Sequence, residues 1–118
     1  MVDHTSPQLD RVFHALASAT RRAIIMQVAR QELAVQEIAA THSMSLQAVS
    51  KHLQILVAAG LVRQTRDGRI KRCRMNYEPF HDVQDLLQQY RRFWDANLDG
   101  LEDYFQKKRA AEKSSPGQ

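Results

Sequence analysis

The segment from Ser45 to Leu56 reads SLQAVSKHLQIL, and its apolar spacing predicts a helix. At about 100° per residue, four polar side chains share a stripe about 100° wide, and these are Gln47, Ser50, Lys51 and Gln54. A solvated helix face usually carries salt-bridging Glu and Lys, but this stripe has two amides, a hydroxyl, one cation and no acid. Such groups hydrogen-bond base edges and phosphates in a major groove, where a carboxylate would be repelled. The stripe therefore favours a DNA-contacting surface over an ordinary solvated face.

The residues around this segment predict the helix ends and a helix-turn-helix arrangement. Ser45 is a favourable N-cap, and Gly60 can adopt the left-handed conformation that ends a helix. A shorter helix is expected over residues 35–41, and the link 41–44 is short and polar. Two helices joined by a tight connection, the second with a polar outer stripe, are typical of DNA-binding helix-turn-helix proteins.

Two further helices are predicted nearer the N-terminus. The first has four apolar residues spaced along one face, and these are Leu9, Val12, Phe13 and Leu16. The second begins after an N-cap at Ser18 and buries Ile24, Ile25 and Val28. Arg21 and Arg22 lie near the start of the second helix, where basic side chains oppose the helix dipole. We expect them to bond carboxylates of another helix, with a phosphate contact as the alternative.

A β-hairpin is predicted directly after Gly60. Residues 61–66 and 70–77 are strand-like, and Asp67-Gly68 between them is a strong turn signal. Residues 63–74 hold six basic side chains against one acid, a local net charge of +5. A basic hairpin beside a recognition helix is typical of a wing that contacts DNA. The predicted DNA-binding residues are Ser45, Gln47, Ser50, Lys51, Gln54, Arg66, Arg69, Lys71 and Arg72.

A long final helix is predicted from Phe80 to Phe105, because apolar residues recur there every three or four positions. Roughly 26 residues at 1.5 Å each give a rod about 40 Å long. A small winged domain cannot cover this apolar edge alone, so we expect a homodimer. For Tyr90, Phe93 and Trp94, helix packing is favoured over a ligand pocket. The predicted dimer interface consists of Leu9, Val12, Phe13, Leu16, Leu86, Tyr90, Phe93, Trp94, Leu98 and Leu101.

The whole chain is expected to be mostly α with one β-hairpin, a winged helix-turn-helix of about five helices plus the wing. Its 118 residues are enough for one domain, expected over residues 8–105, between a flexible lead 1–7 and a flexible tail 106–118. The net charge of +4 suits an anionic partner. We expect no membrane-spanning segment or signal peptide, and the single cysteine fits a reducing compartment, so a cytoplasmic location is predicted.

Four stretches resemble the ArsR/SmtB family of bacterial winged-helix repressors, and they are LASATRR (16–22), AVSKHL (48–53), AGLV (59–62) and DGR (67–69). The resemblance covers about residues 9–105. It implies a homodimer built on the first and last helices that binds an inverted-repeat operator. It also implies that the helix after Ser45 enters the major groove, while the wing touches the flanking backbone or minor groove.

The chain departs from the metal-sensing members of that family. They carry two cysteines on the third helix, where this chain has Ala34 and Gln36. Other members hold metal with Asp and His of the last helix, where this chain offers His81 near the beginning. We therefore predict no metal and no cofactor; a site assembled across a dimer is the alternative. The sequence leaves the effector, the operator and the target genes open.

Two residues with reactive side chains are predicted to be structural. His52 lies on the apolar side of the recognition helix, so a partly buried, hydrogen-bonded histidine is favoured over a base contact. Cys73 alternates inward on the hairpin and is favoured as a small buried side chain over a redox sensor.

Three functional classes can be compared on the sequence. A dimeric repressor fits the stripe and the wing best. A winged-helix module for protein–protein assembly is the alternative, weakened by the acid-free stripe and the basic wing. Nothing supports an enzyme, because no nucleophile–base pair has a usable spacing and no Gly-rich phosphate loop is present.

Overall fold

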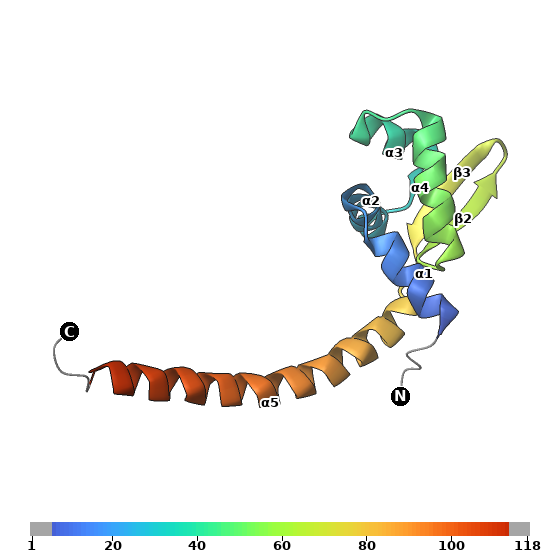
Figure 1. Ribbon diagram of the computed structural model, residues 1–118. Helices are drawn as coiled ribbons and strands as arrows, with labels where there is room; N and C mark the ends of the chain where they lie inside the picture. The colour runs from blue at the N-terminus through green and yellow to red at the C-terminus, as the bar shows by residue number, and fades with distance from the viewer. Residues whose placement is uncertain (1–5, 114–118) are drawn as a thin grey trace. The chain divides into compact units, whose positions relative to one another are not determined.

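The computed structural model describes residues 6–113, and Figure 1 traces their helices and strands. The chain divides into two compact units, one ending at Val83 and the other beginning at Gln84. The elements in chain order are α1 (Pro7–Leu16), α2 (Ala19–Arg30), β1 (Leu33–Ala34), α3 (Val35–His42), α4 (Leu46–Ala58), β2 (Val62–Asp67), β3 (Ile70–Met75) and α5 (Pro79–Lys113). This is the predicted mostly α architecture with a hairpin.

Serine side chains cap three of the helices, as their positions in the sequence predict for Ser18 and Ser45. The Oγ of Ser18 accepts a hydrogen bond from the amide of Arg21 at 3.3 Å, which satisfies one of the free amides in the first turn of α2. Ser6 caps α1 in the same way and Pro7 is its first residue. The predicted flexible lead 1–7 is therefore wrong for these two residues, and residues 1–5 lie outside the described part of the chain.

The guanidinium groups of Arg21 and Arg22 bond the end of α1 rather than any carboxylate. Arg21 donates to the carbonyl of Ala15 at 2.8 Å and to that of His14 at 2.9 Å. Arg22 donates to the carbonyl of Leu16 at 2.6 Å. The last carbonyls of a helix lack intrahelical partners and carry partial negative charge, so two cations stabilise them. The predicted structural role is confirmed, but its predicted acceptor was wrong.

The helix-turn-helix forms from α3 and α4. The predicted helix over 35–41 extends to His42, and Ser43 then takes a left-handed conformation with φ 52° that reverses the chain. Ser45 caps α4 as predicted, with its Oγ accepting from the amide of Ala48 at 3.1 Å. At the other end Gly60 has φ 77°, the left-handed residue expected after the helix. A Cβ added to Gly60 would also lie 3.2 Å from Nε2 of Gln8, so the Gln8 side chain would have to shift slightly, and the positive φ is the main reason for glycine here.

The hairpin belongs to a three-stranded antiparallel sheet with the order β1-β3-β2. Its turn is one residue later than predicted, because Asp67 still pairs with Ile70 and the two turn residues are Gly68, with φ 64°, and Arg69. The short strand β1 was not predicted, and it pairs Leu33 with Cys73. Since β1 covers the inner edge of β3, the wing is joined to the domain by backbone hydrogen bonds.

Cys73 lies at the centre of this sheet and is fully buried, as predicted. Burial raises the pKa of its thiol, and the amide of Gln64, which donates to Sγ at 3.5 Å, opposes the shift. A thiol held in its neutral form is a poor nucleophile, so the packing role is the one that this environment favours.

The core of the first unit is apolar and comes from every helix of that unit. Ile24, Ile38 and Leu56 are completely buried, and so are Val49 and Leu61. Leu9 and Val12 of α1 also belong to this core, at 5% and 1% exposed. Their assignment to the dimer interface is therefore wrong, because the inward face of α1 is already covered within one chain.

In the second unit, α5 continues as a helix to Lys113. The predicted flexible tail 106–118 is thus wrong for residues 106–113, and residues 114–118 are not described. The segment QKKRAAEK from Gln106 to Lys113 consists of good helix formers, and the next Pro is Pro116. Leu86, at 4% exposed, is buried in a single chain, which removes it from the predicted interface.

Candidate nucleic-acid interface

The two sides of α4 divide as the helical wheel predicts. Val49, Leu53 and Leu56 lie on the inner side and are 0%, 1% and 0% exposed. The side chains of the predicted polar stripe lie outward, with Gln47, Lys51 and Gln54 exposed and Ser50 half-buried. Core packing of one face therefore fixes the direction in which the other face presents its polar groups.

A groove of about 190 Å³ joins the stripe to the wing. Ser50 and Gln54 of α4 line it on one side, and Arg69 and Lys71 of the hairpin line it on the other. The structure thus brings together four of the predicted residues from two separate elements. Gln36 of α3 and Gln64 of β2 also line the groove and were missed by sequence reasoning.

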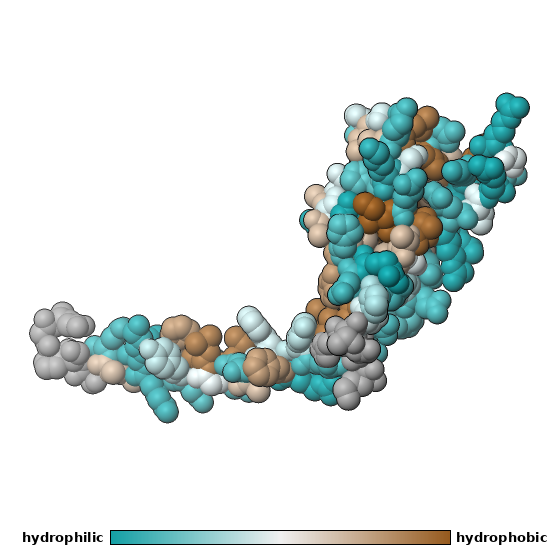
Figure 2. Space-filling view, turned by 45° about the vertical axis from the view of Figure 1, so that its right-hand side comes forward, coloured by the Kyte–Doolittle hydropathy of each residue, from teal (hydrophilic) through white to brown (hydrophobic). Residues whose placement is uncertain are grey.

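The two faces of the hairpin differ. Gln64 pairs with Cys73 and Arg66 with Lys71 across the strands, which puts these four side chains on one face. Arg72 lies on the opposite face, where its Nε is 3.8 Å from the carboxylate of Asp67. Of the predicted wing residues, Arg69 and Lys71 line the groove, Arg66 lies on the same face of the hairpin as Lys71 without lining it, and Arg72 lies on the opposite face. Figure 2 shows that hydrophilic residues cover the hairpin.

The remaining predicted contacts lie at the start of α4 and on the hairpin. Ser45 is exposed, and although its Oγ accepts the capping bond, its hydroxyl hydrogen is free to donate to a phosphate. Arg66 and Arg69 are exposed. His52 is half-buried, with Nδ1 3.4 Å from the Arg21 guanidinium, which confirms the predicted partly buried, hydrogen-bonded histidine.

Comparison with known proteins places this arrangement in a family. A helix-turn-helix domain model matches residues 16–65. The crystal structure of an ArsR family transcriptional regulator is 33% identical and has a TM-score of 0.74, covering 80% of this chain and 97% of that one. The chain belongs to the ArsR family.

Other ArsR-like proteins give the same picture. An ArsR-like regulator from Rhodococcus is 30% identical, with a TM-score of 0.67 over 82% of this chain and 92% of that chain. Another similar structure is the homodimeric winged helix-turn-helix domain of a possible ArsR-family regulator from Mycobacterium bovis. It is 33% identical, with a TM-score of 0.57 over 79% of this chain and 83% of that chain. The predicted fold, family and regulator class are confirmed, and the family is one of transcriptional regulators rather than enzymes.

The curated relatives are matched over different lengths. A Mycobacterium tuberculosis HTH-type transcriptional regulator is 47% identical over 52% of this chain, which spans 56% of that relative. An HTH-type transcriptional regulator of Bacillus subtilis is 35% identical over 63% of this chain and 88% of its own length. The chain therefore spans just over half of the first relative and most of the second.

The positions at which metal-sensing ArsR proteins hold thiolates do not fit a metal here. Ala34 offers a methyl group at the end of β1, and its amide donates to the Glu37 carboxylate at 2.9 Å. Gln36 lines the groove beside α4. Within residues 6–113, His, Cys, Asp and Glu side chains form no group of three that could hold an ion. Among the helices described, none combines the length and apolar character needed to cross a membrane.

Proposed function

We propose that this ArsR-family protein is a dimeric transcriptional repressor that binds an inverted-repeat operator in the cytoplasm without a metal. In this proposal α4 enters the major groove and the wing contacts the adjacent backbone. The observation that supports it best is the groove in which Ser50 and Gln54 of α4 lie beside Arg69 and Lys71 of the hairpin. Two copies would read half-sites about 34 Å apart, one turn of DNA.

The polar stripe of α4 and the basic wing suit different parts of DNA. A glutamine amide donates and accepts at once, so Gln47 or Gln54 can pair bidentately with adenine in the major groove. Arginine and lysine bind phosphates without reading sequence. Helix α4 is therefore assigned to sequence recognition and the wing to affinity.

The dimer is proposed on the exposed apolar residues of α1 and α5. Phe13 is 41% exposed, and Phe93 and Trp94 are 71% and 63% exposed. Figure 2 shows apolar side chains on the surface of α5. Water-exposed aromatic side chains at this density are typical of an interface. After the three corrections above, the proposed interface is Phe13, Leu16, Tyr90, Phe93, Trp94, Leu98 and Leu101.

The substitutions Gln47→Ala and Gln54→Ala test sequence recognition. If either amide pairs with a base, its loss is expected to reduce the discrimination between operator and random DNA by about 1–3 kcal/mol. Fluorescence anisotropy with both DNAs, after the operator has been found by footprinting on genomic DNA, measures the difference. Gln88→Ala, which removes an exposed amide from α5, is the matched control. Unchanged discrimination in both stripe variants would remove α4 from the proposed recognition role.

The substitutions Arg69→Ala and Lys71→Ala test the wing. Each is expected to weaken operator and random DNA alike, and to reduce the salt dependence of binding by about one unit per lost phosphate contact. Titrations at several salt concentrations give that slope. Arg92→Ala removes the same charge from exposed α5 and should leave the slope unchanged. A wing variant that altered specificity but kept the slope would contradict the division of roles.

Metal independence is tested with chelator-treated protein. Soft metals need thiolates, and harder ones need clustered imidazole and carboxylate ligands, which the described residues do not assemble. Operator affinity is therefore expected to stay within about tenfold when zinc, nickel, copper(I) or arsenite is added, a coupling below about 1.4 kcal/mol. A larger loss of affinity, or a stoichiometric metal retained through purification in chelator, would overturn the prediction.

A further inference from the structure

Leu46, the first residue of α4, is a large apolar side chain in a mainly polar and basic groove. It is 48% exposed, and together with Val35 of α3 it supplies the apolar part of the groove's lining. Val35 is 8% exposed and belongs to the core. Leu46 is therefore the apolar side chain of this groove that a bound molecule can reach.

The position of Leu46 on α4 aligns it with two polar side chains of the groove. At about 3.6 residues per turn, Leu46, Ser50 and Gln54 follow one another on the same side of the helix, and all three line the groove. Leu46 also comes directly after the N-cap Ser45, and the N-terminal residues of a recognition helix are those that contact base edges. In the proposed complex with DNA, Leu46 therefore faces the bases.

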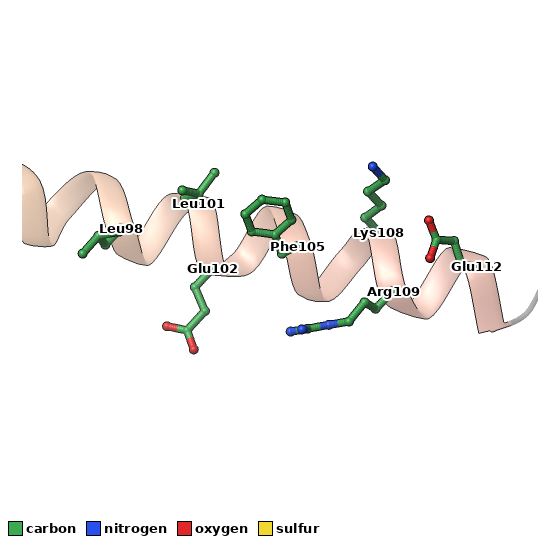
Figure 3. Close-up of a pocket in the computed structure, with 7 residues that line it drawn as sticks. All are labelled: Leu98, Leu101, Glu102, Phe105, Lys108, Arg109 and Glu112. Carbon is green, nitrogen blue, oxygen red and sulfur yellow. The ribbon is translucent and has the colours of Figure 1, made fainter.

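The exposed apolar side chains of α5 have different neighbours from those of Leu46. Figure 3 shows Leu98, Leu101 and Phe105 in successive turns of that helix, and each of them is at least 40% exposed. Apolar side chains grouped in this way are typical of a surface that meets another protein. Leu46 is instead followed on its side of α4 by a hydroxyl and an amide, and two basic side chains of the wing lie across the groove. This environment favours an anionic, hydrogen-bonding partner that carries an apolar group.

DNA presents such an apolar group in its major groove. It is the C5-methyl group of thymine, whereas the other groups on the base edges there are hydrogen-bond donors and acceptors. A leucine side chain cannot pair with a donor or an acceptor, but it can pack against a methyl group. A glutamine amide pairs bidentately with adenine, the partner base of thymine. A helix face with glutamines and an exposed leucine is therefore suited to A·T base pairs.

We propose that Leu46 is a specificity-determining residue that packs against the C5-methyl group of a thymine in each half-site of the operator. The contact removes the methyl group and part of the Leu46 side chain from water, which favours binding through the hydrophobic effect. Leu46 precedes Gln54 by about 12 Å along the helix, so the two side chains contact different base pairs. The inference rests on the proposed function, since it requires α4 in the major groove, and it adds the base that the start of α4 reads.

Deoxyuridine tests this contact on the DNA side, because uracil lacks the C5-methyl group but pairs as thymine does. Each thymine of the footprinted operator is replaced in turn, and fluorescence anisotropy gives the dissociation constant of the wild-type protein. At one position in each half-site, the replacement is expected to raise the dissociation constant about fourfold, the effect of burying one methyl group less. Replacing both symmetric positions together should raise it about fifteenfold, since two distant contacts add in free energy.

Substitution of Leu46 tests the same contact on the protein side. Leu46→Ala should bind the operator and its doubly substituted form with dissociation constants equal to within about twofold, because the apolar partner of the methyl group is gone. Leu46→Met keeps an apolar side chain of similar volume and should retain most of the difference between the two DNAs. Met26→Ala is the matched control, since it shortens a side chain of α2 that is 57% exposed and should discriminate as the wild type does.

The possible results separate this inference from the proposed function. A wild-type protein that protects no genomic site, or that binds its operator no better than random DNA, would refute the proposed function. Specific binding that no deoxyuridine weakens would overturn the inference and leave recognition by α4 in place. The same conclusion would follow if deoxyuridine weakened the binding of Leu46→Ala as much as that of the wild type.

Discussion

Leu56→Ala is expected to lower the free energy of unfolding by about 3 kcal/mol, because it removes three carbons from a fully packed site. Leu56 is 0% exposed and belongs to the core, on the side of α4 opposite the polar stripe. Its side chain holds the helix that carries Gln47 and Gln54, so the loss affects both the fold and the orientation of the proposed DNA-contacting face.

Urea unfolding followed by circular dichroism measures this effect, at a fixed protein concentration because a dimer's stability depends on it. Val57→Ala, at the next residue and 39% exposed, is the control and should cost less than about 1 kcal/mol. Equal losses in the two variants would mean that the two sides of α4 are not divided as described.

Arg21→Ala is expected to cost about 2 kcal/mol of stability, since hydrogen bonds to a charged group are the stronger kind. The guanidinium donates to the carbonyls of His14 and Ala15 at the end of α1 and approaches His52 of α4. Alanine would remove the donor from these two carbonyls and would also remove the contact with His52, so this link from α2 to both α1 and α4 would be lost.

Arg21→Lys separates charge from geometry. Lysine keeps the positive charge beside the helix terminus but cannot present several fixed donors, so we expect it to recover about half of the loss. Arg11→Ala, which removes an exposed arginine from α1, is the control and should be nearly neutral. Full recovery by lysine would show that charge alone accounts for the contribution of Arg21.

The helices and their caps could be predicted because their signals are local. Ser18, Ser45 and Gly60 are residue types whose capping geometry is decided within a few neighbours. The apolar spacing of α4 likewise assigned Val49, Leu53 and Leu56 to the core, and the +5 charge of the hairpin pointed to the wing that lines the groove.

Features that depend on distant contacts could not be predicted. β1 has two residues, too few for a pattern, and exists because β3 pairs with Leu33 and Ala34. Gln36 lines the groove because α3 packs beside α4. The residues around Gln36 carry no local pattern from which this packing could be predicted. The spacing of Leu9 and Val12 showed an apolar face, but spacing cannot tell whether that face meets its own chain or another copy.

The tail illustrates a different limit. The segment from Gln106 to Lys113 is rich in charged residues, and a composition of this kind favours a flexible tail. Lysine, arginine, glutamate and alanine are among the best helix formers. Because adding such residues to an existing helix is favourable, the helix that begins at Pro79 continues through them to Lys113.

The division of α4 into a buried side and an outward stripe also makes the protein a candidate for retargeting. Because the stripe residues Gln47, Lys51 and Gln54 are exposed while the core side chains are not, new residues can be grafted at these positions with little loss of stability. His52 should be kept in any such chimera, since Arg21 approaches it from α2. A library varied only on the outward side would then alter the preferred operator while the scaffold stayed the same.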